Sequence, residues 1–103
     1  MTEFSLVLLS PDREWFAGSV VSVVAPGADG ELGVLAHHIP MVAGLKAGVA
    51  TVRLADGKIL YFAVDGGVLG VQKNGVRLLT GRVVAADTLE KAQTTLAGLH
   101  RKK

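Results

Sequence analysis

The sequence predicts a mainly β fold: a small antiparallel β-sandwich of about eight to ten strands, followed by one short C-terminal α-helix. Twelve of the thirteen glycines lie at or before Gly81, and they separate short apolar runs as tight turns separate strands. The 103 residues are half hydrophobic and only 19% charged, which suits one modest core and excludes a disordered chain. After Ala86 the turn residues stop and a helical pattern begins. We therefore expect a sandwich domain over residues 1–86, and a helix with a basic tail over residues 87–103.

The first part of the chain predicts four short strands. Apolar residues alternate in the first two, as they do in strands that bury one face. A turn at residues 10–12 follows the first strand, and glycine or proline bounds the other two. Residues 46–48 are expected to end the fourth strand. The four predicted strands span residues 4–9, 19–24, 31–35 and 41–45.

Two hairpins follow, centred on Asp56-Gly57 and Asn74-Gly75. Both dipeptides supply the positive φ angles that a two-residue hairpin turn demands. A bend at residues 65–67 separates the hairpins. The expected strands span residues 49–54, 58–64, 68–72, 76–80 and, as a last edge strand, 82–86. Turn-forming roles are assigned to Gly30, Gly33, Gly57, Gly66, Gly67 and Gly75.

The last segment predicts one helix over residues 87–100. Asp87 and Glu90 have the spacing of a capping box. A helix of this length is marginal in isolation, so its apolar side needs a packing partner, either the sandwich or another protein. That apolar side consists of Leu89, Ala92, Leu96 and Leu99.

Composition excludes several classes of protein. The net charge is +2, and its basic excess lies in the C-terminal tail rather than across a folded face, so we expect no nucleic-acid binding. No apolar run approaches the length of a membrane span, and the N-terminus does not resemble a secretion signal. The absence of cysteine excludes disulfides, thiolate metal sites and a cysteine nucleophile.

The sequence contains little that indicates a catalytic or metal-binding site. His37 and His38 are adjacent, so in an extended chain they point to opposite sides and do not easily share one ion. No glycine motif for nucleotides is present, and no serine lies in a nucleophile elbow. We expect no cofactor, no metal and no enzyme activity. Two alternatives stay open: an enzyme with a site at Asp29, Glu31 and His38, and a stand-alone β-sandwich that binds a small ligand or a peptide.

Residues 30–40 concentrate unusual constraints. They hold two glycines, an acid, two histidines and a proline, which is more than a plain connection needs. Loops on a rigid scaffold often carry binding sites. This segment is therefore our candidate for an interaction site.

The same region carries a resemblance to a known family. Residues 23–40, VVAPGADGELGVLAHHIP, closely resemble the signature of the epsilon subunit of F-type ATP synthases, which is the delta subunit in mitochondria. The similarity continues in SPDR at 10–13, LKAGV at 45–49 and VDGGVLGV at 64–71. It covers residues 3–80 in the same order and at the same spacing.

The resemblance implies a non-catalytic rotor subunit of the central stalk. Such a subunit links the gamma shaft to the membrane c-ring and couples ion translocation to ATP synthesis or hydrolysis. Its implied partners are therefore the gamma subunit and the c-ring, in a hetero-oligomeric complex. The implied location is peripheral, at the cytoplasmic face of the bacterial inner membrane. The resemblance also implies a c-ring-facing interface at Asp29 and Glu31, and a gamma-facing interface at His38, Pro40, Met41 and Val42.

The sequence departs from the family pattern at three places, one of which is the segment 80–86, TGRVVAA, where the family usually has A-D-T-A. Ala36 stands where the family usually has proline, which should loosen the loop. Family members carry a C-terminal helical hairpin, whereas this sequence predicts a short form with one helix and no second one. In many bacterial members the hairpin reaches into the catalytic head and inhibits hydrolysis. We therefore expect inhibition by C-terminal extension to be weak or absent.

Overall fold

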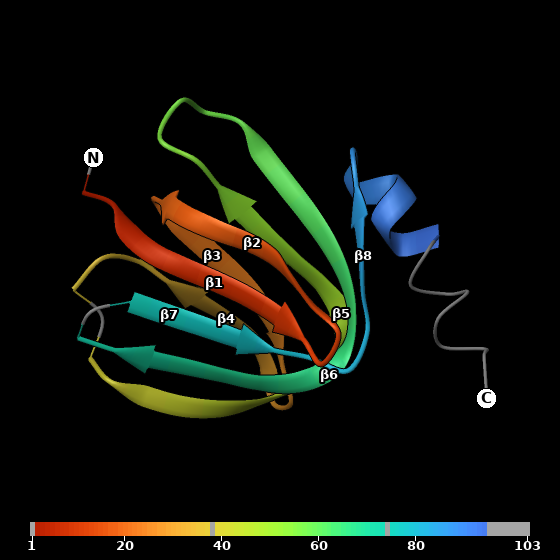
Figure 1. Ribbon diagram of the computed structural model, residues 1–103, viewed down its shortest axis with the longest axis horizontal. Coiled ribbons are helices and arrows are strands. Elements are labelled where there is room, and N and C mark those ends of the chain that lie inside the picture. Colours follow the sequence, from red (N-terminus) through yellow and green to blue (C-terminus); the bar gives the residue numbers. More distant parts are fainter. Residues whose placement is uncertain (1, 38, 74, 95–103) are drawn as a thin grey trace.

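A computed structural model describes residues 2–37, 39–73 and 75–94. Within these ranges the chain forms eight strands and a short C-terminal helix (Figure 1). The strands are β1 (Phe4–Ser10), β2 (Arg13–Val20), β3 (Ser22–Gly27), β4 (Gly30–Val34), β5 (Met41–Arg53), β6 (Ile59–Gln72), β7 (Gly75–Leu79) and β8 (Val83–Ala86).

Two long strands, β5 and β6, build the sandwich because they pass through both layers. They pair with each other along almost their whole length. The first half of β6 also pairs with β8, and its second half pairs with β7. One layer therefore has the order β2-β1-β7-β6-β5, and the other has β8-β6-β5-β3-β4. The long curved course of both strands is visible in Figure 1. The predicted β-sandwich with one short helix is confirmed.

The predicted strand breaks at residues 46–48 and 65–67 are wrong, because both segments stay inside strands. Leu45 pairs with Gly67 and Ala47 pairs with Asp65, so the ladder continues through the bend. Gly67 has a φ of 134°, a conformation that side chains disfavour. A Cβ there would also collide with the carbonyl oxygen of Leu79. Glycine thus lets β6 bend toward the second layer without losing its partner strand.

One strand pair is parallel, which corrects the prediction of a purely antiparallel sandwich. β1 runs parallel to β7, with Leu6 opposite Val76 and Leu9 opposite Leu79. The predicted strand over residues 19–24 is also wrong, since it is divided at Val21 between β2 and β3. β2 begins well before it, at Arg13.

The hairpin at Asp56-Gly57 is confirmed, but its turn is not the predicted two-residue one. The Leu54 amide donates to the Lys58 carbonyl at 2.8 Å, so residues 55–57 form a three-residue loop. Gly57 has a φ of 91°, and the Lys58 amide donates to Asp56 Oδ1 at 2.9 Å. Of the other glycines predicted to form turns, three lie inside strands instead: Gly33 lies in β4 opposite Val24, and Gly66 and Gly67 lie in β6. Gly30 and Gly75 begin β4 and β7.

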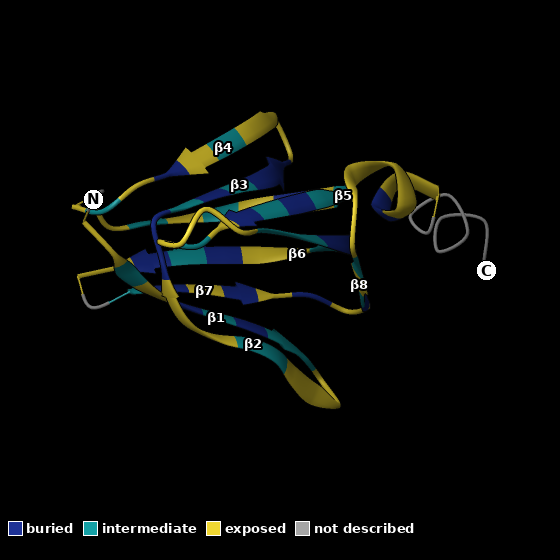
Figure 2. Cartoon of the chain, turned by 90° about the horizontal axis from the view of Figure 1, so that it is seen from above, coloured by how far each residue is buried: buried dark blue, intermediate teal, exposed yellow. Residues whose placement is uncertain are grey.

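The core lies between the two layers. Alternate residues of β1 and β7 point into it, as do residues of β3, β5 and β6, and Figure 2 shows the alternation of buried and exposed positions along these strands. Full burial of one such aliphatic side chain contributes about 1.5–3 kcal/mol. Phe16 of β2 meets Phe62 of β6 edge to face, with ring centroids 6.4 Å apart, so the rings join one layer to the other. Large side chains with no exposed surface include Leu6, Leu8, Val23, Val52, Leu69 and Leu78.

The helix covers residues 89–94 of the described chain. Its cap is Thr88 rather than the predicted Asp87. Thr88 Oγ1 accepts a hydrogen bond from the Lys91 amide at 3.1 Å, and the Ala92 amide donates to the Thr88 carbonyl at 3.0 Å. The predicted apolar positions Leu96 and Leu99 lie outside the described residues. No helix within the described ranges is long and apolar enough to cross a membrane.

Candidate protein-binding surface

An exposed apolar face covers the outer side of the β5–β6–β7 layer. Val42 is 79% exposed, Leu79 46% and Val68 41%. Val68 lies opposite Leu79 on β7 and opposite Gly44 on β5, while Val42 lies opposite Gly70. Residues directly opposite in a ladder point to the same side of a sheet. These positions therefore form one continuous surface, which we call the apolar face.

The connection between β4 and β5 carries two further exposed apolar side chains. Leu35 is 63% exposed and Ile39 is 74% exposed. His37, between them, has a φ of 67°, which is uncommon for a residue with a side chain. Such conformations cluster at binding sites, where the surrounding structure holds them in place. Exposed apolar residues gathered in this way are typical of a surface that binds another protein.

An acidic turn borders the apolar face. Asp29 lies in the turn between β3 and β4, and Glu31 follows in β4; both are exposed. The Ala28 amide donates to the Gly44 carbonyl at 2.9 Å, which ties the turn to β5. A groove of about 380 Å³ lies between them, lined by both acids and by Val42. The carboxylates and the apolar face therefore meet at one groove.

The structure brings together three of the six residues predicted for the interfaces: Asp29, Glu31 and Val42. Pro40 is exposed, and it precedes β5. Met41 is half-buried and packs against the core, so only part of its side chain reaches the surface. His38 lies outside the described residues. The assignment of these residues to particular partners stays a prediction.

Sequence reasoning missed Arg77, the charged residue that β7 adds to the apolar face. Val76 and Leu78 are buried, whereas Arg77 and Leu79 are exposed, so the strand alternates between core and outer face. Arg77 lies opposite Gly70 of β6. The alternation in residues 75–79 was the signal that could have placed it beside Leu79.

The turn between β1 and β2 holds a chain of polar contacts. Trp15 Nε1 donates to Ser10 Oγ at 2.9 Å, and Ser10 Oγ donates to Asp12 Oδ1 at 2.6 Å. The hydrogen bond from Ser10 is the main reason that the pKa of Asp12 lies below its usual value. The guanidinium of Arg13 lies 4.0 Å from the centre of the Trp15 ring. These contacts fix the turn at the edge of the sandwich.

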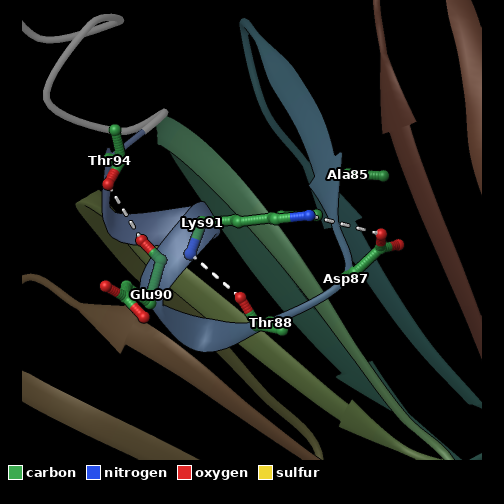
Figure 3. A pocket seen from close by; sticks show the side chains of 7 residues that line it. Ala85, Asp87, Thr88, Glu90, Lys91 and Thr94 are labelled. Atoms are coloured by element: carbon green, nitrogen blue, oxygen red, sulfur yellow. Dashed lines mark hydrogen bonds and ion pairs between the residues drawn. The ribbon is translucent and has the colours of Figure 1, made fainter.

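A second groove, of about 660 Å³, lies between the end of β8 and the helix (Figure 3). Most of its polar side chains are engaged by neighbouring residues, the Glu90 carboxylate excepted. Lys91 Nζ lies 3.9 Å from Asp87 Oδ2, and the Thr94 hydroxyl donates to the Glu90 carbonyl at 3.1 Å. The groove therefore offers a ligand few free polar groups.

The alternative readings gain little from the structure. Among residues 2–37, 39–73 and 75–94, no group of three or more histidine or acidic side chains is placed to hold a metal ion. Asp29 lies on an exposed turn and Glu31 is exposed in β4, so neither carboxylate is buried in a catalytic cleft. The apolar face is the feature that most needs an explanation.

Comparison with known proteins agrees with the resemblance described above. Residues 3–86 match the family described as ATP synthase, Delta/Epsilon chain, beta-sandwich domain. The chain is 39% identical over 90 residues to the ATP synthase epsilon chain of Dichelobacter nodosus, covering 87% of this chain and 63% of the relative. It is 40% identical over 88 residues to that of Sinorhizobium fredii, covering 85% and 66%. The chain thus spans less than two thirds of the length of these relatives.

Solved structures show the same fold. One is a chain in the cryo-EM structure of the Euglena gracilis mitochondrial ATP synthase with OSCP, F1 and c-ring: the TM-score is 0.78 and the identity 25%, over 99% of this chain and 66% of that one. Another, in the central stalk and c-ring of the Tetrahymena thermophila mitochondrial ATP synthase, has a TM-score of 0.68 at 14% identity, over 96% of this chain and 91% of that one, and shows the fold alone. From the family match and the identity to epsilon chains, this chain belongs to the ATP synthase delta/epsilon family and carries its β-sandwich domain.

Proposed function

We propose that this chain is a non-catalytic rotor subunit in the central stalk of an F-type ATP synthase. In this role it links the gamma shaft to the membrane c-ring and couples ion translocation to ATP synthesis or hydrolysis. The observation that carries the proposal is the apolar face, in which Val42 of β5 is 79% exposed. A small sandwich with such a face is suited to permanent contact with another protein.

The two predicted interfaces have different chemistry, which supports different partners. The gamma-facing side comprises His38, Pro40, Met41 and Val42, and burial of its apolar surface supplies affinity. The c-ring-facing side comprises Asp29 and Glu31. An exposed ion pair contributes only about 0–1 kcal/mol, so these acids set the register of the contact more than its strength.

The proposal also covers organisation and location. Residues 1–86 act as the docking unit, and residues 87–103 form an appended helix with a basic tail. The chain takes no cofactor and performs no catalysis. It lies at the cytoplasmic face of the bacterial inner membrane, where its partner subunits hold it.

A binding measurement with one changed residue tests the proposal. The full chain is titrated against an F1 complex that contains gamma and has been stripped of its own copy of this subunit. Val42→Asp places a charge on the apolar face, and we expect it to weaken binding about tenfold or more, as for a central interface residue. Ala85→Asp places the same charge at an exposed residue of β8, in the other layer, and should leave binding unchanged.

Two results would contradict the proposal. The first is a wild-type chain that does not bind the gamma-containing complex under conditions that keep the synthase intact. The second is a Val42→Asp chain that binds as tightly as the wild type while remaining folded. The c-ring contact has a separate readout: Glu31→Gln should reduce ATP-driven ion pumping by the whole complex more than it reduces binding to F1.

A further inference from the structure

Arg77 stands in the apolar face with no counter-ion among the residues that the structure describes. We propose that Arg77 is a specificity-determining residue of this face and that it binds a carboxylate of the protein seated there. This inference rests on the proposed function, since it requires that the apolar face docks a partner. It adds the chemistry that the partner must present: apolar side chains around one aspartate or glutamate.

The register of three strands places Arg77 within the apolar face. On one side it lies opposite Gly70 of β6, which in turn lies opposite Val42 of β5. On the other side it lies opposite Val7 of β1. Leu79, two residues along β7, is exposed on the same face. The residues directly opposite Arg77 are therefore a glycine and a valine, while the polar Ser5 and Gln72 lie two residues further along β1 and β6 on the same side.

The cationic residues of this face are complementary to an acidic group on the partner. In the described part of the chain the one ion pair joins Lys91 to Asp87, so Arg77 has none. Lys46, the next exposed residue after Gly44 on the same side of β5, adds a second cation. Two sets of acids border the face without pairing with Arg77. Glu14 of β2 lies opposite Leu9, with all of β1 between it and β7. Asp29 and Glu31 meet the face at the groove beside Val42, with β6 between Val42 and Arg77.

Docking would make an unpaired arginine unfavourable. When a protein covers the apolar face, water leaves it, and a buried charge without a partner strongly opposes binding. A carboxylate restores the balance, because the planar guanidinium donates two parallel hydrogen bonds to it. Gly70, beside Arg77, has nothing within 4 Å of the position that a Cβ would take. This open floor leaves room for the partner's side chain to reach the guanidinium.

The same charges disfavour a second copy of this chain as the occupant. In a two-fold dimer each copy presents the same patch to the other. A two-fold axis that passes near Arg77 would bring two guanidiniums together across a dehydrated surface, which is unfavourable. A dimer that paired Arg77 with Asp29 or Glu31 of the other copy would need an axis displaced toward Val42. The proposed partner is a different protein with a complementary acidic residue, and a dimer is one of the outcomes that the test below separates.

Three substitutions of Arg77 separate charge from packing. Arg77→Met keeps an apolar stem and removes the charge, Arg77→Lys keeps the charge and removes the planar fork, and Arg77→Glu reverses the charge. Binding of each full chain to the stripped, gamma-containing F1 complex is measured at low and at high salt. Arg53→Glu is the matched control, since Arg53 is exposed at the end of β5 in the other layer.

We expect Arg77→Glu to weaken binding about a hundredfold or more and Arg77→Met about tenfold or more, as when one partner of a buried charge pair is lost. Arg77→Lys should fall between wild type and Arg77→Met, and Arg53→Glu should bind as wild type. Arg77→Met binding as tightly as wild type would overturn the inference, even if Val42→Asp abolishes binding. Dimerisation of the wild-type chain through this face would overturn it too. Failure of the wild-type chain to bind F1 would instead refute the proposed function.

Discussion

Replacing Gly67 by alanine tests whether the bend of β6 depends on this glycine. Its φ of 134° belongs to a region that only glycine populates readily, and holding another residue there costs about 1–3 kcal/mol. The new methyl group would meet the Leu79 carbonyl and lie 2.9 Å from the Thr80 Cα. Forcing β7 to move by that amount costs about 1–3 kcal/mol more. The expected loss is therefore about 2–6 kcal/mol, a large share of the 5–15 kcal/mol that stabilises a typical domain.

Urea denaturation of the purified chain measures this loss as a lower midpoint with an unchanged slope. Gly70→Ala is the matched control on the same strand, because a Cβ there meets nothing within 4 Å and Gly70 has no positive φ. Its free energy of unfolding should stay the same or rise by about 0.4–1 kcal/mol. If Gly67→Ala lies within about 1 kcal/mol of wild type, the bend does not depend on glycine and the reasoning is wrong.

Three further substitutions test other contacts. Ser10→Ala should raise the pKa of Asp12 toward its ordinary value of 3.8, followed by NMR titration of the carboxyl group. Because the pKa of Asp12 is lowered in the folded state, the stabilising effect of this contact is present above pH 3.8 and is lost as the pH falls through the lowered folded-state pKa. An unchanged Asp12 pKa in the Ser10→Ala variant would contradict the role assigned to Ser10. Thr88→Ala should remove the cap and cost the helix about 0.5–2 kcal/mol, seen as faster amide exchange in the helix. Leu69→Ala should lower the free energy of unfolding by about 2–5 kcal/mol, measured by thermal or urea unfolding. Val68→Ala, at the exposed neighbouring residue, should lower it by less than about 1 kcal/mol. Equal losses would mean that the burial pattern of β6 is misassigned.

Most of the strands could be predicted because local signals define them. Asp56-Gly57 fixes one hairpin through its own backbone preferences, and alternating apolar residues identify the buried faces. The bend at Gly66-Gly67 was also visible in the sequence. Whether such a bend ends a strand depends on hydrogen bonds to β5, which no local pattern reveals, and so one bent strand was predicted as two.

Other features depend on contacts between distant residues or on a choice between equivalent ones. The strands β1 and β7 pair in parallel although they lie far apart in the sequence, and nothing in the sequence of either strand indicates this pairing. Asp87 and Thr88 are both good capping residues, and tertiary placement of the helix decides between them. Asp29 and Glu31 were singled out by their motif, whereas Arg77 belongs to no motif and becomes notable only beside Val42 and Val68.

The parallel pair of β1 and β7 also determines how the chain folds as it is made. β1 leaves the ribosome first, but its partner β7 follows only after β5 and β6 have been synthesised. Closing so long a loop carries an entropic cost, and sheets that depend on distant pairings fold slowly. The hairpin of β5 and β6 is local, so it can form early and offer β7 a template. Until then Leu6 and Leu8 remain uncovered, and the nascent chain is most prone to aggregation in that interval.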